Sequence, residues 1–350
     1  MEGLIQHIQF NEINLKDTFF DSLKDDYSGF EEWFSRKSKE KAYVLYNEGK
    51  TLEAFLYLKV ENGPILDVLP NIQYGKVLKI GTLKINPHGT RLGERFLKKA
   101  IDLAIDTKVE CIYVTVFKRH EPLVALFKKY GFVDYGKKEN HTGEELVLLK
   151  SLKAIHNDQL LDYPRVSQKG KKKYLLSIFP EFHTRLFPDS ILRNESFNVI
   201  EDVSHTNSIH KAYISFAPIS NLNSGDLIVI YRTSDKKGPA KYRSVATSIC
   251  VVEEMKSKSD FISSIDFIDY CKKHSIFTTE ELKGFYEEHK RINVIKMTYN
   301  IALRKRLTRE RLIDEVGIDP NERWTFINLT ETQFESIIMA GDIHESLIVD

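Results

Sequence analysis

Cysteine is scarce in this sequence. Only three of its 350 residues are cysteines, and they are Cys111, Cys250 and Cys271. They lie far apart, without the close spacing that a metal site needs. Cys111 and Cys250 fall inside apolar, β-like runs, where a buried, reduced thiol is the expected state. The cysteines therefore give no reason to expect a metal centre.

The sequence also lacks a strong net charge and a long apolar run. Its 51 Lys and Arg residues nearly balance its 50 Asp and Glu residues, so bulk charge argues neither for nor against a polyanionic partner. No apolar run approaches the roughly 18–20 residues of a membrane span, and no signal peptide opens the chain. We therefore expect a soluble, cytoplasmic protein without a membrane partner. The oligomeric state stays open.

The stretch from Val77 to Phe132 has the clearest pattern. A strand with alternating apolar residues runs into a loop that contains Pro and Gly, and the loop opens a long amphipathic helix. A second strand and a second helix follow. The first-turn N–H groups of a helix have no partner within it, and its dipole favours an anion. Gly89 and Gly93 would let a pyrophosphate approach this backbone closely.

This order resembles the GNAT acyltransferase superfamily, whose acetyl-CoA signature is Arg/Gln-x-x-Gly-x-Gly/Ala between the fourth strand and the next helix. The aligned residues here are His88, Gly89, Thr90, Arg91, Leu92 and Gly93. The leading Arg/Gln of the family falls on His88 and its middle Gly on Arg91. The alternative is an ordinary strand–turn–helix, in which the glycines serve only turn geometry and packing.

The resemblance implies acetyl-CoA as co-substrate. The six loop residues would hold its pyrophosphate, and Leu83, Lys84 and Ile85 of the fourth strand would hold the pantetheine and the thioester. It also implies direct transfer of the acetyl group to an amine. Such a transfer needs a base for the amine, donors for the oxyanion and an acid for the leaving thiolate.

The catalytic groups are less clear. The Tyr that usually serves as acid aligns with Phe127, which cannot donate a proton, and Tyr130 is expected to be a packing or surface residue. His120 and Glu32 are the candidate catalytic residues, although His120 could simply begin a helix. Asp67 lies in an apolar stretch that could raise its pKa, or in a turn that faces water. No base can be chosen from the sequence.

Residues 1–150 are predicted to form one α+β domain of the GNAT type. The pattern predicts strands or hairpins over 3–13, 42–60, 77–85, 110–117, 132–135 and 144–149. It predicts helices over 15–27, 30–40, 92–104 and 122–130. Because the chain is too long for one domain of about 150 residues, a second domain should follow.

The second half changes character. Residues 151–190 are predicted to be a linker and domain entry, and 191–350 a β-barrel with helices inserted late. Short apolar runs are predicted as strands over 197–203, 210–218, 225–233, 242–255, 291–303 and 324–330. Helices are predicted over 259–271, 278–288, 303–318 and 331–341. The segment GDLIVIYRT with YRSVATSICVVEE resembles the PUA-like barrels, including their ASCH and EVE relatives, which commonly bind RNA or a modified DNA base.

Four residues of this domain are candidates for nucleic-acid binding. Tyr231, Arg232, Tyr242 and Arg243 place an aromatic beside a cation on each arm of one predicted hairpin. Bases stack on aromatic faces, and Arg pairs with phosphates or base edges. Tyr–Arg pairs in barrels are as often structural. The helix predicted over 303–318 adds a basic face.

The sequence thus predicts an acetyl-CoA-dependent N-acetyltransferase whose acceptor is RNA or an RNA-bound amine presented by the PUA-like domain. One alternative is a protein or small-amine acetyltransferase that uses the barrel for protein contacts. Another is a CoA-responsive nucleic-acid-binding protein without turnover.

Overall fold

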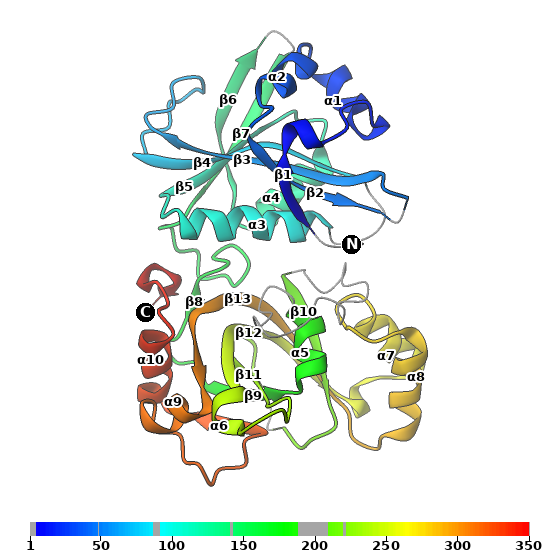
Figure 1. Ribbon diagram of the computed structural model, residues 1–350, viewed down its shortest axis with the longest axis vertical. Helices are drawn as coiled ribbons and strands as arrows, with labels where there is room; N and C mark the ends of the chain where they lie inside the picture. The colour runs from blue at the N-terminus through cyan, green and yellow to red at the C-terminus, as the bar shows by residue number, and fades with distance from the viewer. Residues whose placement is uncertain are drawn as a thin grey trace. The chain divides into compact units, whose positions relative to one another are not determined.

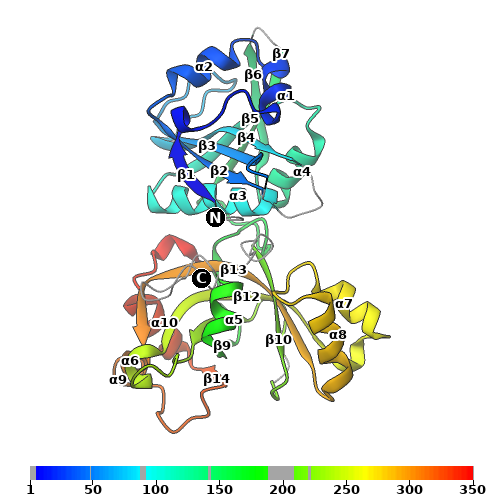
Figure 2. The ribbon, with the colours of Figure 1, turned by 45° about the vertical axis from the view of Figure 1, so that its right-hand side comes forward.

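The computed structural model describes residues 5–47, 49–86, 92–140, 143–187, 209–219 and 222–349. The chain divides into two compact units, Met1–Asp162 and Tyr163–Asp350 (Figures 1 and 2). Each unit combines a mixed β-sheet with helices, which confirms the predicted α+β class. Within the described ranges, no helix is both long and apolar enough to span a bilayer.

The first unit is built on a seven-stranded sheet of order β1-β2-β3-β4-β5-β7-β6. Its strands are β1 Gln6–Gln9, β2 Lys41–Tyr46, β3 Leu52–Asn62, β4 Lys76–Ile85, β5 Cys111–Val116, β6 Val133–Asn140 and β7 Gly143–Ser151. Its helices are η1 Phe10–Glu12, η2 Thr18–Phe20, α1 Asp21–Asp26, α2 Phe30–Arg36, α3 Leu92–Asp106 and α4 Glu121–Lys129. The predicted order of elements is confirmed, except that the helix predicted over 15–27 is divided between η2 and α1. The helical segment begins at Thr18 because the carboxylate of Asp17 caps η2 by accepting the N–H of Phe19.

The two faces of this sheet are covered by different helices. In both ribbon views α3 runs along one face, while α1 and α2 lie on the other side (Figures 1 and 2). The α3 helix buries an apolar stripe that includes Phe96, Ala100 and Ile101. On the α2 side, Phe55 and Tyr57 of β3 pack into an aromatic cluster with the helix. Phe55 and Tyr57 are two residues apart and therefore face the same layer, as a strand of period two requires.

The pairing between β4 and β5 ends early. These parallel strands are paired from Val77↔Cys111 to Ile80↔Val114, although β4 continues to Ile85. At the same point Gly81 is an extra residue opposite β3, which pairs Tyr57 with Thr82 and the next residue with Ile80. Such a bulge bends the strand. A Cβ on Gly81 would lie 2.7 Å from Cδ1 of Tyr57, so this close approach requires glycine.

The second unit contains a six-stranded sheet of order β10-β13-β12-β11-β9-β14 and a small sheet of β8 and β15. Its strands are β8 Val166–Ser167, β9 Lys173–Ile178, β10 His210–Ser215, β11 Leu227–Arg232, β12 Val245–Ser257, β13 Asn293–Thr308, β14 Phe326–Leu329 and β15 Ile348–Val349. Its helices are α5 Pro180–Leu186, α6 Ala240–Arg243, η5 Lys258–Asp260, α7 Ser264–Cys271, α8 Thr279–Glu288, α9 Arg309–Asp314, α10 Glu331–Ala340 and η6 Glu345–Leu347. The described part of the large sheet has β10 and β14 at its edges.

The structure differs from the predictions in two parts of this unit. Residues 303–308, predicted as helix, extend β13, and its last two residues, Leu307 and Thr308, pair with Ala246 and Val245 of β12. Only α9 is helical, and Thr308 caps it by accepting the N–H of Arg311. The segment 151–190 holds β8, β9 and α5, and the unit begins at Tyr163. The strand predicted over 197–203 lies outside the described residues.

Candidate functional site in the first unit

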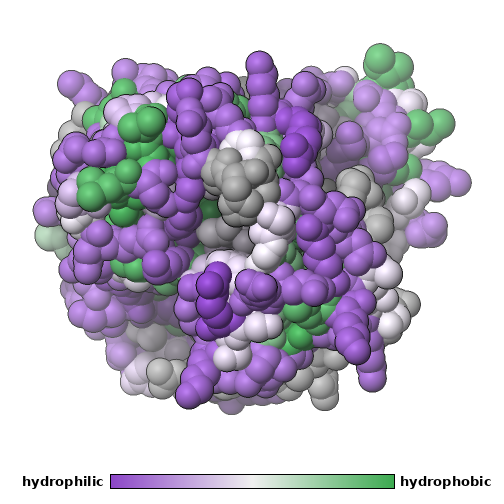
Figure 3. Space-filling view, turned by 90° about the horizontal axis from the view of Figure 1, so that it is seen from above, coloured by the Kyte–Doolittle hydropathy of each residue, from purple (hydrophilic) through white to green (hydrophobic). Residues whose placement is uncertain are grey.

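A cavity of about 1300 Å³ lies where β4 and β5 separate. Its walls come from α1 and α2, from the facing parts of β3, β4 and β5, and from the first turns of α3 and α4. Charged lining residues are Asp26, Glu32, Arg36, Lys37, Lys59, Glu61, Lys79, Lys84, Arg119, His120, Lys138 and Glu145. On the face of the protein shown in Figure 3, hydrophilic side chains predominate and apolar ones form small separate groups. Apolar side chains, among them Leu23, Phe30 and Trp33, also line the cavity, which therefore suits a ligand that has both apolar and polar parts.

One wall holds the residues predicted for the cofactor. Leu83, Lys84 and Ile85 of β4 line the cavity, beyond the last residue pair with β5. Gly93, in the first turn of α3, lines it as well. A Cβ there would lie 2.8 Å from Cδ2 of Leu126, so Gly93 also permits close packing of α3 on α4.

Of the other predicted loop residues, the structure describes only Leu92. Leu92 is buried at the start of α3. His88, Gly89, Thr90 and Arg91 lie outside the described residues. The predicted pyrophosphate contacts of these four residues therefore stay a prediction.

The two predicted catalytic residues line the same cavity. His120 is the N-cap residue of α4, and its Nε2 lies 3.1 Å from Oδ2 of Asp26. Arg119 donates to the other oxygen of Asp26 at 2.6 Å. Since a carboxylate can only accept, Nε2 of His120 is the donor, and in the neutral imidazole Nδ1 is then the acceptor. Glu32 reaches the lining from α2, on an exposed face of that helix.

The helix α4 has Phe127 at the position where the resemblance predicts a tyrosine, and no other described residue of the helix takes the place of that tyrosine. Phe127 is fully buried and packs on Phe132, with ring centroids 4.9 Å apart. Tyr130 is also fully buried, which confirms its expected packing role. The α4 residues that line the cavity are Pro122, Leu123 and Leu126. The described part of this helix therefore brings no hydroxyl group to the cavity.

Sequence analysis missed an acid–tyrosine pair in the cavity. Tyr27 donates to Oε1 of the buried Glu145 at 2.9 Å, and both side chains line the cavity. Burial, followed by the charge of Glu145, raises the pKa of Tyr27 strongly. A separation of 118 residues leaves no local pattern from which this pair could be predicted.

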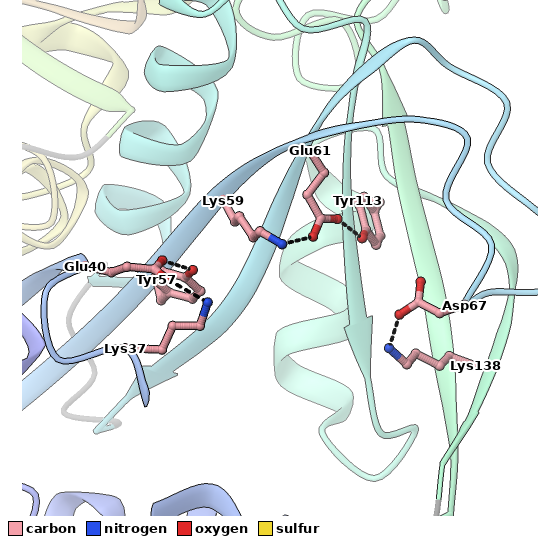
Figure 4. Close-up of polar contacts among 8 residues, drawn as sticks. All are labelled: Lys37, Glu40, Tyr57, Lys59, Glu61, Asp67, Tyr113 and Lys138. Atoms are coloured by element: carbon pink, nitrogen blue, oxygen red, sulfur yellow. Dashed lines mark hydrogen bonds and ion pairs between the residues drawn. The ribbon is translucent and has the colours of Figure 1, made fainter. Parts of the chain in front are cut away.

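A row of charged side chains crosses the sheet next to the cavity (Figure 4). Glu61 accepts from Lys59 at 2.8 Å and from the hydroxyl of Tyr113 at 2.5 Å. Asp67 accepts from Lys138. Burial alone would raise the pKa of Asp67, but the hydrogen bond from Lys138 and the nearby lysine charges outweigh it and lower the pKa. The hypothesis of a raised pKa at Asp67 is therefore wrong.

The nucleic-acid candidates of the second unit lie in unequal surroundings. Tyr231 and Arg232 end β11 and are only 1% and 3% exposed. The Tyr231 ring packs on Trp324, with centroids 5.2 Å apart, so its faces are not open to a base. Tyr242 and Arg243 belong to the short helix α6 and not to a hairpin arm. Tyr242 is 52% exposed, while Arg243 makes a bidentate ion pair with Asp235.

No family model matches the sequence. The chain is similar to the solved structure of ASCH from Zymomonas mobilis, with 10% identity over 48% of this chain and 94% of that one, at a TM-score of 0.33. It is similar to the IAA acetyltransferase from Bacillus cereus, with 16% identity over 42% and 97%, at a TM-score of 0.32. Arabidopsis thaliana NAA60 in complex with acetyl-CoA matches with 13% identity over 42% and 99%, at a TM-score of 0.32.

Proposed function

We propose that the first unit transfers the acetyl group of acetyl-CoA to an amine. The observation that supports this proposal is the separation of β4 from β5 beside a large cavity, with the first turn of α3 at the same end. Past Ile80, β4 is paired with β3 alone, so its other edge can bond an extended ligand such as pantetheine. The first turn of α3 favours the pyrophosphate that follows.

In this proposal two parts of the chain hold the cofactor. The backbone of Leu83, Lys84 and Ile85 holds the pantetheine and polarises the thioester carbonyl. The 88–93 loop holds the pyrophosphate. When acetyl-CoA is bound, its thioester supplies the acyl group and the leaving thiolate.

His120 is our choice for the group that removes a proton from the acceptor amine. Its hydrogen bond to Asp26 orients the imidazole, and in the neutral ring Nδ1 is the nitrogen that can accept the proton. Asp26 therefore has a positioning role. Glu32 lines the cavity from α2, where its carboxylate would attract a protonated amine before transfer.

The proposal is tested on the full chain by calorimetry with CoA and by the release of CoA thiol from acetyl-CoA. We expect CoA to bind, and thiol release to depend on an added amine. His120→Gln should lower kcat by roughly 10²- to 10⁴-fold and leave CoA affinity unchanged. The matched control is His156→Gln, since His156 is exposed and is not part of the cavity lining. Absence of CoA binding would overturn the proposal.

The acceptor class is a finer part of the proposal. We propose RNA or an RNA-bound amine, with the second unit as the RNA-binding part. Exposed Tyr242 beside Lys241, whose Nζ lies 4.4 Å from the ring centroid, supports this choice. Incubation with labelled acetyl-CoA and a total cell lysate tests it. Label in RNA is expected, while label in protein or small amines would replace the acceptor and keep the enzyme.

CoA binding without any labelled product would favour a different function. The protein would then be a CoA-responsive binder, and the loss of the usual tyrosine at Phe127 is the observation that favours it.

A further inference from the structure

Lys79 lies in the cavity close to the point where β4 and β5 stop pairing. It lies on β4 opposite Lys59 of β3 and Tyr113 of β5, one residue before the last β4–β5 pair. Its side chain lines the cavity, and its direct pairing with Lys59 and Tyr113 puts it on the same face of the sheet as those two side chains. A ligand that enters between the separated strands therefore meets this ammonium group.

The charged neighbours of Lys79 are already engaged with other groups. Glu61 is held by Lys59 and Tyr113, and Asp67 is held by Lys138 (Figure 4). Glu145 accepts the hydroxyl of Tyr27. The carboxylates in this part of the described structure thus each receive a donor other than Lys79.

The side chain of Lys79 makes neither a hydrogen bond nor an ion pair with any described residue. Its Nζ lies 5.5 Å from the ring centroid of Tyr113. Burial lowers the pKa of Lys79, and the charge of Lys138 lowers it further, while Glu61, Asp67 and Glu145 act in the opposite direction. A partly buried ammonium without a direct acceptor is costly. An anionic group that enters the cavity would offset this cost.

We propose that the acceptor amine also carries an anionic group, a carboxylate or a phosphate, and that Lys79 binds this group in the cavity. The inference rests on the proposed acetyl transfer, because the same cavity would hold the acceptor. It names a substrate class that neither the cofactor loop nor His120 defines.

The test uses matched pairs of acceptors that differ in the anionic group. Tyrosine is compared with tyramine for a carboxylate, and phosphoethanolamine with ethanolamine for a phosphate, by acetyl-CoA-dependent thiol release. We expect the anionic member of at least one pair to have a kcat/KM roughly 10- to 100-fold higher than its neutral partner. The pair that shows the preference identifies the anion.

Variants assign the preference to Lys79. Lys79→Met should abolish it by raising KM for the anionic acceptor alone, and Lys79→Arg should keep most of it, because the charge remains. Lys138→Met is the matched control, since Lys138 lines the same cavity and its charge is already held by Asp67. An equal loss for neutral and anionic acceptors in Lys79→Met, or equal activity on both members of both pairs in the unaltered protein, would overturn the inference.

A binding measurement separates this inference from the proposed function. Calorimetry with inorganic phosphate and with succinate, on the CoA-loaded full chain, needs no turnover. Binding of either anion that is lost in Lys79→Met and kept in Lys79→Arg supports the inference even if no amine is acetylated, in which case only the proposed function fails. Acetylation of neutral amines without anion binding rejects the inference and keeps the function.

Discussion

The two large sheets of this protein differ in whether the pairing of neighbouring strands resumes after an irregularity. In the first unit, β4 and β5 stop pairing at Ile80↔Val114 while both strands continue, and a cavity of about 1300 Å³ lies at the opening. In the second unit, the ladder of β12 and β13 runs from Ser257↔Asn293 to Val245↔Thr308 and resumes after each of three register shifts. Pairing therefore ends at the irregularity in the first unit and resumes after those in the second.

The difference decides what charged side chains can do. At the opening in the first unit, Lys79 and His120 reach a space that a ligand can enter. Along the continuous sheet of the second unit, Tyr231 and Arg232 are covered by neighbouring elements. A polar residue on a strand therefore indicates a binding site only when the sheet next to it is open.

The largest difference that we expect between the units is in how their stability changes at acid pH. His183 is fully buried in the second unit, and burial, followed by the charges of Arg232 and Arg306, lowers its pKa to about 3. In the unfolded chain this group titrates near 6.5, so below that pH only the unfolded state takes up the proton. Stability of the second unit should therefore fall as pH falls from about 6.5 towards 3, by about 1.4 kcal/mol per pH unit.

The two tryptophans can follow the units separately. Trp33 lies in the first unit and Trp324 in the second, so Trp33→Phe and Trp324→Phe variants each leave one reporter. Urea unfolding at several pH values should show the acid sensitivity in the signal of Trp324, and His183→Gln should reduce it. An unchanged pH slope in His183→Gln would contradict the assignment.

A glycine comparison tests the bulge that opens the first sheet. Gly81→Ala would place a methyl group 2.7 Å from the Tyr57 ring, and overpacking of this kind costs about 1–3 kcal/mol. Gly284→Ala in the exposed helix α8 meets only Oε1 of Glu288 at 3.9 Å, so it should stabilise by about 0.5–1 kcal/mol. Denaturant midpoints measure both. Equal effects of the two substitutions would show that Gly81 is not held against Tyr57.

Part of this organisation could be predicted from the sequence. The long helix α3 and the strands on either side of it follow from periodicity, because each buries one apolar stripe or face. The capping of α8 by Thr278, with Glu281 completing the box, is likewise local.

Other features depend on distant partners. Residues 303–308 have a basic, helix-like composition, yet they extend β13, whose end is held by the pairing of Leu307 and Thr308 with β12. Tyr27 and Glu145 form a hydrogen bond although 118 residues separate them. The ammonium group of Lys79 lacks a direct acceptor among the described residues because the nearby carboxylates accept from other donors. No spacing in the sequence records such arrangements, so the acid–tyrosine pair and the role of Lys79 required the structure.

The smallest effect on stability is expected at Tyr242. Its ring is 52% exposed on α6, so Tyr242→Ala should change the free energy of unfolding by no more than about 0.5 kcal/mol. If the second unit binds RNA through this ring, the same substitution should weaken binding by about 1–3 kcal/mol, the contribution of one stacked base. Tyr231→Phe is the matched control, because its ring is buried against Trp324 and offers no open face. Fluorescence anisotropy with a labelled single-stranded RNA measures both variants. Equal RNA affinity of Tyr242→Ala and the unaltered protein would remove Tyr242 from the RNA-binding surface, and the comparison between the units would then rest on the cavity alone.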